Sequence, residues 1–334
     1  MILPVASHRQ TSVESKYERG VEVVTLHRCC KLLICHMSDQ FQEPQSLIES
    51  SRSPFPYLLY REFLDAESCQ TLIGDAESFS NSSSRREVMG GRALLPNTSS
   101  TFRDLVHSSK EWQSLERLLN SPEFLAMITN GLALKVRYSP IDVYTNRSGK
   151  FVRVIQRIRE SAQNTPLANA SARQIFALSL LRTIHASRRV LSGTIARLRG
   201  RVAYEMLFDY SRARNGYVRE IHRDSDARDI VFLIYFNSTA ASDGGALRLH
   251  RLNPGTRVIP RPDPSHCSLE REIVPSAGTL VAFENTACAY HSVEKIVGTD
   301  TQRHFVYGAV TRLVGRSSGL HGEERLKTDW RIYT

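Results

Sequence analysis

The residues best suited to chemistry are His222 and Asp224, on either side of Arg223, with His291 67 residues after Asp224 and Arg303 12 residues further on. Two imidazoles and one carboxylate form a three-ligand face on a metal ion and leave the opposite face open. Such a donor set suits ferrous iron that must also bind a co-substrate and O₂. A basic residue after the last ligand, here Arg303, suits the far end of a dicarboxylate co-substrate. The pattern therefore predicts an iron site that is open to a co-substrate.

The elements around these residues must bring distant positions together. His222 and Asp224 fit an extended segment, because side chains two residues apart on a strand share a face, and Arg223 then points the other way. His291 can reach this pair only if the strands fold back on themselves. A His-x-Asp pair alone is weak evidence and occurs often by chance. A purely structural role for all three residues, followed by Arg303, is harder to justify.

The second half of the chain has the pattern that such folding requires. From Val202 onward, short β segments alternate with turns. The predicted strands are 202–210, 217–223, 230–237, 246–250, 271–274, 279–283, 291–296 and 304–311. Eight short strands in this length indicate a sandwich or squashed barrel, not a parallel α/β sheet. We expect an α+β chain with a mainly β core.

The N-terminal half is predicted to support this core. Residues 54–64 read as a strand, and Asp65 can cap the helix that follows. Residues 80–101 are rich in Ser, Arg, Gly and Asn and are predicted to form a loop. Two further helices are expected at 105–119 and 122–128.

The chain divides into five parts by composition. These are a leader (1–36) without periodicity, an N-terminal strand with supporting helices (37–130), a basic helical insert (131–201), the β core (202–316) and a C-terminal tail (317–334). The leader is predicted to be disordered, or else its translation start is mis-assigned. The stretch from Lys135 to Arg201 holds 14 Lys and Arg against two acids, a charge of +12. Because the whole chain carries +10, the remainder is close to neutral at −2.

The basic insert has two readings. Its arginines could bind RNA, an anionic protein or a phosphorylated small molecule. Alternatively, it is a solvated, Arg-rich helical cover over the open side of the barrel. We favour the cover, because aromatic residues for base stacking are nearly absent there. Nucleic acid is therefore a disfavoured partner, and the oligomeric state is left open.

Bulk properties favour a soluble, cytoplasmic protein. Composition is ordinary, with 41% hydrophobic and 23% charged residues. No stretch is long and apolar enough to span a bilayer, and the N-terminus lacks a secretory pattern, so no membrane association is expected. The six cysteines show no framework spacing and are predicted to be free thiols in a reducing compartment.

The motifs that follow the His-x-Asp pair occur in a specific order. They are Tyr235-Phe236-Asn237, Gly244-Gly245-Ala246-Leu247, the run from Pro275 to Phe283, and His291-Ser292-Val293. From about residue 204 to 311 the chain resembles the Fe(II)- and 2-oxoglutarate-dependent oxygenases, especially their prolyl-4-hydroxylase-like branch. The resemblance implies a double-stranded β-helix, a jelly-roll or cupin-like barrel, with N-terminal helices packed on it.

The resemblance also implies residue roles. His222, Asp224 and His291 match the catalytic iron ligands, and Arg303 matches the residue that binds the C5 carboxylate of 2-oxoglutarate. Tyr235 matches a tyrosine that donates its hydroxyl to the same carboxylate.

Three assignments keep alternatives. Tyr210 resembles a tyrosine near the co-substrate, although a place in the barrel core is the favoured interpretation for Tyr210 and an equal alternative for Tyr235. The extra residues Glu220 and Ile221 before His222 weaken the match of Tyr210. If Arg303 faces outward, His304 or Arg312 would replace it as the anchor.

The implied activity is hydroxylation of a C–H bond with Fe(II), 2-oxoglutarate and O₂, supported by ascorbate, and with release of succinate and CO₂. Peptidyl proline, another amino acid or a small metabolite would all fit as substrate. The presence of Asp224 argues against halogenation, because halogenases of this family have a small residue in that position. Two alternatives remain: a catalytically silent barrel that binds polyanions or proteins, and a zinc hydrolase, in which Arg303 would have no evident role.

Overall fold

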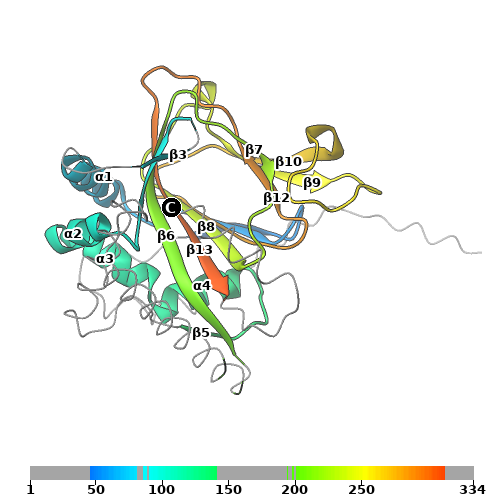
Figure 1. Cartoon of the computed structure of the whole chain (residues 1–334), viewed down its shortest axis with the longest axis horizontal. Helices are drawn as coiled ribbons and strands as arrows, with labels where there is room; N and C mark the ends of the chain where they lie inside the picture. Colours follow the sequence, from blue (N-terminus) through cyan, green and yellow to red (C-terminus); the bar gives the residue numbers. More distant parts are fainter. Residues whose placement is uncertain are drawn as a thin grey trace, which may run out of the picture.

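The computed structural model describes residues 46–80, 86–88, 90–140 and 201–312, with the single positions 194 and 198. Two β-sheets face each other, and helices cover the outer side of the larger one (Figure 1). The predicted leader, most of the basic insert and the C-terminal tail lie outside the described residues. So does the end of the predicted core domain at residue 316.

The large sheet has nine strands and the small sheet four. In spatial order the large sheet contains β1 (Ser46–Ser51), β2 (Tyr57–Arg61), β11 (Leu280–Glu284), β8 (Arg228–Tyr235), β13 (Gln302–Arg312), β6 (Val202–Arg214), β4 (Arg92–Pro96) and β3 (Arg86–Val88), with β5 (Tyr138–Pro140) also beside β6. The small sheet contains β10 (Cys267–Ile273), β9 (Leu247–Leu252), β12 (Tyr290–Val293) and β7 (Arg219–His222).

The last eight strands form a double-stranded β-helix. Strands β6, β8, β11 and β13 lie in the large sheet, whereas β7, β9, β10 and β12 lie in the small one. The chain therefore passes back and forth between the two sheets, as in a jelly roll. The predicted mainly β core is confirmed, and each of the eight predicted strands overlaps an observed one.

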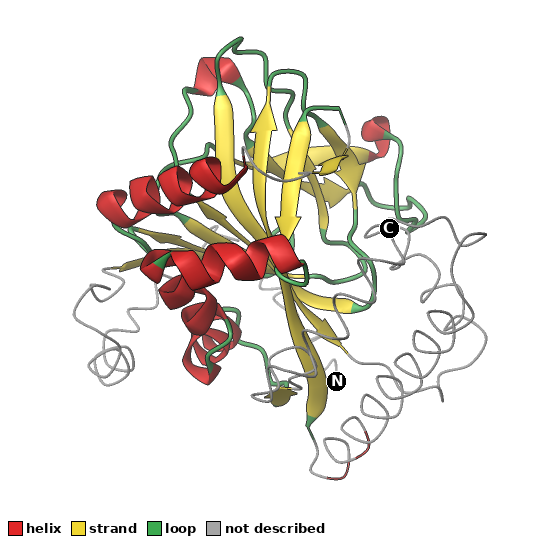
Figure 2. Ribbon diagram, turned by 60° about the vertical axis from the view of Figure 1, so that its left-hand side comes forward, coloured by secondary structure: helices red, strands yellow, loops and turns green. Residues whose placement is uncertain are grey.

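Four helices pack on the outer face of the large sheet (Figure 2). They are α1 (Ala66–Ser80), α2 (Ser100–Ser108), α3 (Lys110–Leu119) and α4 (Pro122–Gly131). Asp65 accepts a hydrogen bond of 2.7 Å from the N–H of Ser68, which confirms the predicted cap. The single helix predicted at 105–119 is wrong, because the chain is extended at Ser109. The hydroxyl of Ser109 accepts from the N–H of Trp112 and begins a new helix there.

Strand β8 is buried on both faces, which explains its unbroken apolar run. Its even-numbered residues face the helices and its odd-numbered residues face the barrel interior. The outward set is Ile230, Phe232 and Ile234, and the inward set is Val231, Leu233 and Tyr235. The large sheet is thus a wall between two apolar clusters, one under the helices and one inside the barrel.

The loop predicted at 80–101 is wrong in part. Residues 86–88 and 92–96 form β3 and β4, and β4 pairs antiparallel with β6. Their polar composition does not indicate strands, because pairing of β4 with β6 and of β3 with β4 stabilises them without an apolar run. Arg92 extends from β4 to the barrel interior, where its guanidinium lies 5.3 Å from the ring centroid of Phe305.

Residues 138–140, predicted as part of the helical insert, instead form β5. This strand pairs in parallel with the start of β6, with Tyr138 opposite Val202. The N–H of Val202 also donates to the carbonyl of Arg137 at 2.8 Å. The chain therefore leaves and re-enters the described structure at neighbouring points.

Two further expectations can be compared with the described residues. None of their helices is long and apolar enough to cross a membrane. Cys69, Cys267 and Cys288 are free thiols, as predicted.

The Gly308→Ala substitution is expected to lower the free energy of unfolding by about 1–3 kcal/mol, because it overpacks the apolar cluster under the helices. A Cβ at Gly308 would lie 2.1 Å from the ring of Phe232, and that ring packs edge-on against Phe124 of α4. Urea denaturation measures the change. Gly74→Ala is the control: no atom lies within 4 Å of its Cβ position in α1, so a gain of about 0.5–1 kcal/mol is expected. Equal stability of the two variants would contradict this description of the core.

Candidate active site

His222 and His291 face each other because β7 and β12 pair in a register that places them opposite one another. Asp224 lies two residues beyond the end of β7 and turns its carboxylate to the same place. One ligand atom from each of the three side chains lies within 4.8 Å of the other two. Nε2 of His291 is 3.5 Å from Oδ2 of Asp224. The structure thus brings together the three predicted ligands, all of them buried.

Backbone carbonyls orient both imidazoles. Nδ1 of His222 is 2.8 Å from the carbonyl oxygen of Glu220, and Nδ1 of His291 is 3.1 Å from that of Ala289. A carbonyl oxygen can only accept, so each Nδ1 carries the proton and donates. The lone pair of each Nε2 is then available to a metal, which is the usual arrangement of ligating histidines.

Two neighbours hold the Asp224 carboxylate in position. Nη1 of Arg228 donates to Oδ1 at 2.6 Å, and the hydroxyl of Tyr307 donates to Oδ2 at 2.9 Å. The same Nη1 donates to the Tyr307 hydroxyl at 2.6 Å, which closes a three-residue network. Each carboxylate oxygen retains a lone pair for a cation.

The protonation states already match a cation site. Burial acts to raise the pKa of Asp224, but Arg228, then His291 and His222, and the hydrogen bond from Tyr307 outweigh it and lower this pKa. Burial and the neighbouring His291 lower the pKa of His222 to about 3. Burial also lowers the pKa of His291. One anionic carboxylate and two neutral imidazoles are therefore present near neutral pH.

Arg303 and Tyr235 lie on the interior side of the large sheet and are both fully buried. The Arg303 guanidinium lies 5.0 Å from the ring centroid of Tyr235, and its Nη1 donates to the carbonyl of Gly245 at 2.6 Å. Within the described ranges, its Nε and Nη2 and the Tyr235 hydroxyl have no hydrogen-bond partner. Leaving such groups unsatisfied costs about 1–3 kcal/mol each. Unsatisfied donors on a buried cation indicate a place for an anionic ligand.

The Gly244-Gly245 motif supports Arg303. Both glycines have positive φ, at 74° and 82°. A Cβ on Gly244 would lie 2.1 Å from the carbonyl oxygen of Lys295, so only glycine allows this close approach. The motif therefore does more than form a turn, because it presents the Gly245 carbonyl to the guanidinium.

The structure does not bring Tyr210 to this site, and its predicted contact with the co-substrate is corrected. Tyr210 points from β6 to the helix side of the large sheet, where it packs edge-on against Trp112. Its hydroxyl lies 2.7 Å from Nδ1 of His304, which also faces outward. Neighbouring residues on a strand alternate between faces, so Arg303 is inside and His304 outside. Because Arg303 faces inward, neither fallback anchor is needed. Arg312 instead forms an ion pair with Asp229.

Sequence reasoning missed four interior residues near the ligands. These are Tyr307, Arg228, Arg92 and Tyr217. Tyr307 could have been found from the period of two along β13, because it shares the inward face with Arg303. Arg228 lies four residues after Asp224, but nothing in the sequence shows that their side chains meet. Tyr217 begins the predicted strand 217–223, and it belongs to the same interior cluster as Tyr235.

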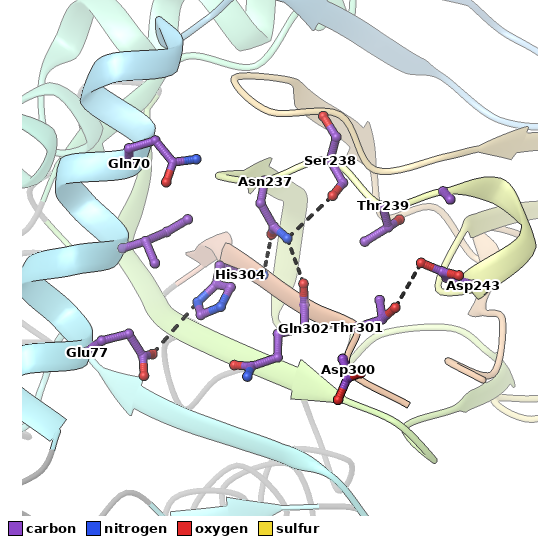
Figure 3. A pocket seen from close by; sticks show the side chains of 12 residues that line it. Gln70, Glu77, Asn237, Ser238, Thr239, Asp243, Asp300, Thr301, Gln302 and His304 are labelled. Atoms are coloured by element: carbon purple, nitrogen blue, oxygen red, sulfur yellow. Dashed lines mark hydrogen bonds and ion pairs between the residues drawn. The ribbon is translucent and has the colours of Figure 1, made fainter. Parts of the chain in front are cut away.

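A cavity of about 540 Å³ lies on the helix side of His304, away from the metal ligands. Figure 3 shows its lining of polar side chains from α1, from the segment after β8 and from the start of β13, with His304 facing Glu77. It includes none of the three ligands and neither Arg303 nor Tyr235. This cavity is therefore separate from the candidate active site.

The family comparison agrees with this geometry. Residues 203–309 match the family model of the 2OG-Fe(II) oxygenase superfamily, a range that contains the three ligands, Tyr235 and Arg303. This part of the chain therefore matches a 2OG-Fe(II) oxygenase domain. A comparison with curated proteins gives no match.

The solved structures to which the chain is similar include two prolyl hydroxylases. The prolyl-4-hydroxylase of Pseudomonas putida is 13% identical, with 77% of this chain and 92% of that chain covered and a TM-score of 0.40. The viral collagen prolyl hydroxylase of Paramecium Bursaria Chlorella virus-1 is 12% identical, covering 78% and 96% with a TM-score of 0.37. The non-heme alpha ketoglutarate dependent epimerase SnoN is 11% identical, covering 76% of each chain with a TM-score of 0.38.

The residues present fit both iron and 2-oxoglutarate. Two neutral imidazoles and a carboxylate suit Fe(II), and among the described residues this is the one such cluster. The unsatisfied donors of Arg303 and Tyr235 fit a carboxylate, which a guanidinium can grip through two hydrogen bonds.

Substitution of Tyr235 by Phe is expected to lower the affinity for 2-oxoglutarate about tenfold, as expected for the loss of one hydrogen bond to a charged group. The same change should leave the unfolding temperature of the ligand-free protein unchanged or higher, because it removes an unsatisfied hydroxyl. Calorimetric titration and thermal denaturation measure the two effects.

Tyr210→Phe is the matched control. Its hydroxyl is hydrogen-bonded to His304, so stability should fall by about 1 kcal/mol while the affinity for 2-oxoglutarate stays constant. The opposite pattern in the two variants would mean that Tyr210, not Tyr235, contacts the co-substrate.

Proposed function

We propose that this protein hydroxylates a C–H bond of an organic substrate, using Fe(II), 2-oxoglutarate and O₂ and releasing succinate and CO₂. One observation carries the proposal: a complete metal-ligand group and a buried arginine with unsatisfied donors share one barrel interior. A purely structural role does not explain Arg303, because the nearest interior carboxylates already have their own arginines. Asp224 pairs with Arg228, and Asp209 with Arg92.

When bound, Fe(II) supplies the activation of O₂, which is coupled to decarboxylation of 2-oxoglutarate. The protein supplies the geometry. His222, Asp224 and His291 would hold the ion through two neutral imidazoles and one carboxylate. Arg228 and Tyr307 keep the carboxylate ionised and fixed, so the ligand set is formed before the metal arrives.

Arg303 and Tyr235 bind the distal carboxylate of the co-substrate. Both are on strands of the large sheet, and strands hold a side chain more rigidly than a loop would. Along β13, Arg303 and Tyr307 share the inward face four residues apart, roughly 13 Å at 3.3 Å per residue. Strand β13 therefore carries the co-substrate anchor at one point and the support of Asp224 at another.

The apolar lining of the barrel keeps water from this region. Val231, Leu233, Val281 and Phe283 are buried in the interior cluster. In such an environment the attraction between Arg303 and a carboxylate is stronger than in water. Binding and orientation thus depend on a few charged groups in an otherwise apolar space.

For the substrate, the proposal includes peptidyl proline, another amino acid and a small metabolite. The basic insert is proposed to cover the open side of the barrel as a solvated helical element. Nucleic acid is the disfavoured partner in this proposal.

Asp224→Asn is expected to reduce the affinity for Mn(II), used as a stable substitute for Fe(II), at least about 100-fold, because it removes the one anionic ligand. Substrate-independent succinate release from 2-oxoglutarate should fall by a similar factor. Metal affinity is measured by electron paramagnetic resonance and succinate by chromatography.

Asp226→Asn is the control, since this exposed carboxylate lies two residues further on and pairs with Arg223. It should bind Mn(II) like the wild type. Unchanged metal affinity in Asp224→Asn, or no succinate from the iron-loaded wild type, would overturn the proposed function.

A further inference from the structure

A cavity of about 340 Å³ opens directly beside the metal ligand His222. Two of its lining side chains are arginines, Arg219 from β7 and Arg261 from the loop between β9 and β10. The one acidic residue in the lining is Glu220, which is exposed. The volume is in the range of small-molecule sites.

A β-bulge places Arg219 on the metal side of β7. His291 pairs with His222 and Val293 pairs with Arg219, so a step of two residues in β12 faces a step of three in β7. Without the extra residue, Arg219 and His222 would point to opposite faces. The bulge contains the extra residues Glu220 and Ile221, and it brings the guanidinium of Arg219 to the metal ligand His222.

The resulting contact cannot persist when a metal is bound. Nε of Arg219 donates to Nε2 of His222 at 3.3 Å, and that lone pair is the one a metal needs. A metal bound at Nε2 would displace the guanidinium from His222, and the cavity that Arg219 lines offers space for it.

Arg219 and Arg261 carry like charges and line the same cavity, so they repel one another. Arg261 has no acidic partner within the part of the chain that the structure describes. An anion placed between Arg219 and Arg261 would relieve this repulsion.

We propose that the substrate carries an anionic group, a carboxylate or a phosphate, which Arg219 and Arg261 bind in this cavity beside the metal. Guanidinium groups suit both anions, since each offers two parallel N–H donors. The proposal rests on the proposed function in one respect, that the bound anion belongs to the molecule being oxidised. It directs the search for substrates to small acids and phosphate esters.

The test titrates protein loaded with Mn(II) and 2-oxoglutarate, without O₂, with inorganic phosphate and separately with acetate. Calorimetry gives the affinities, and the tighter probe identifies the anion. Arg261→Gln and Arg219→Gln are each expected to weaken binding of that probe at least tenfold. Arg257→Gln, in the same loop but outside the cavity lining, should bind it like the wild type.

A second titration, with 2-oxoglutarate, separates a substrate site from the co-substrate site. The affinity for 2-oxoglutarate should stay within twofold in both cavity variants and fall strongly in Arg303→Gln. The proposal is overturned if neither probe binds, if Arg261→Gln binds both like the wild type, or if Arg219→Gln loses 2-oxoglutarate as Arg303→Gln does. Since Arg261 is exposed, its variant remains informative even if Arg219→Gln fails to fold.

Failure of this proposal and of the proposed function give different results. One outcome is that the protein does not bind metal, while Arg261→Gln still weakens phosphate binding to the metal-free protein. The proposed oxygenase function is then wrong, and so is the proposal that the bound anion belongs to the molecule being oxidised. If metal and 2-oxoglutarate bind as described while both arginine variants behave like the wild type, the anion site falls and the oxygenase remains.

Discussion

The pairing of β12 with β7 determines the geometry of the whole site. A shift of this pairing by one residue would turn His291 out of the barrel, because side chains alternate between faces along a strand. His222 opposite His291 fixes two ligands at once, and the turn after β7 needs only to return Asp224 by a short distance. The large sheet then supports Asp224 from the other side through Tyr307. Both sheets must therefore form before the ligand group is complete.

The second constraint is charge inside an apolar barrel. Arg92 and Arg228 each have a carboxylate partner, Asp209 and Asp224. Removing one partner of such a buried pair typically costs about 3–5 kcal/mol. Arg303 differs, since its hydrogen bond is to the neutral carbonyl of Gly245. A dicarboxylate co-substrate supplies the negative charge that this part of the interior lacks. The fold accordingly retains a local electrostatic imbalance that its ligand corrects.

Much of this arrangement could be predicted from the sequence, because the strands of the core are short, apolar and separated by clear turns. The three ligands and Arg303 followed from residue types and spacing, and Tyr235 was implied by the family resemblance. The prediction of Tyr210 was wrong because face depends on register, and the extra residues before His222 obscured that register. β4 was missed because its stability comes from pairing with β6, not from its own composition. The network of Asp224, Arg228 and Tyr307 joins three elements, so no local pattern could reveal it.

The parallel pairing of β5 with β6 has a consequence for how this chain can vary. The chain leaves the described structure after Pro140 and returns at Arg201, and the backbone beside these points is already joined by strand hydrogen bonds. The entropy of closing a loop rises slowly with its length, by about 0.6 kcal/mol for each doubling. The hydrogen bonds between β5 and β6 therefore hold these two points of the backbone together directly. An insertion between two such fixed points costs little closure entropy, so a long segment at this position is compatible with an unchanged arrangement of the metal ligands.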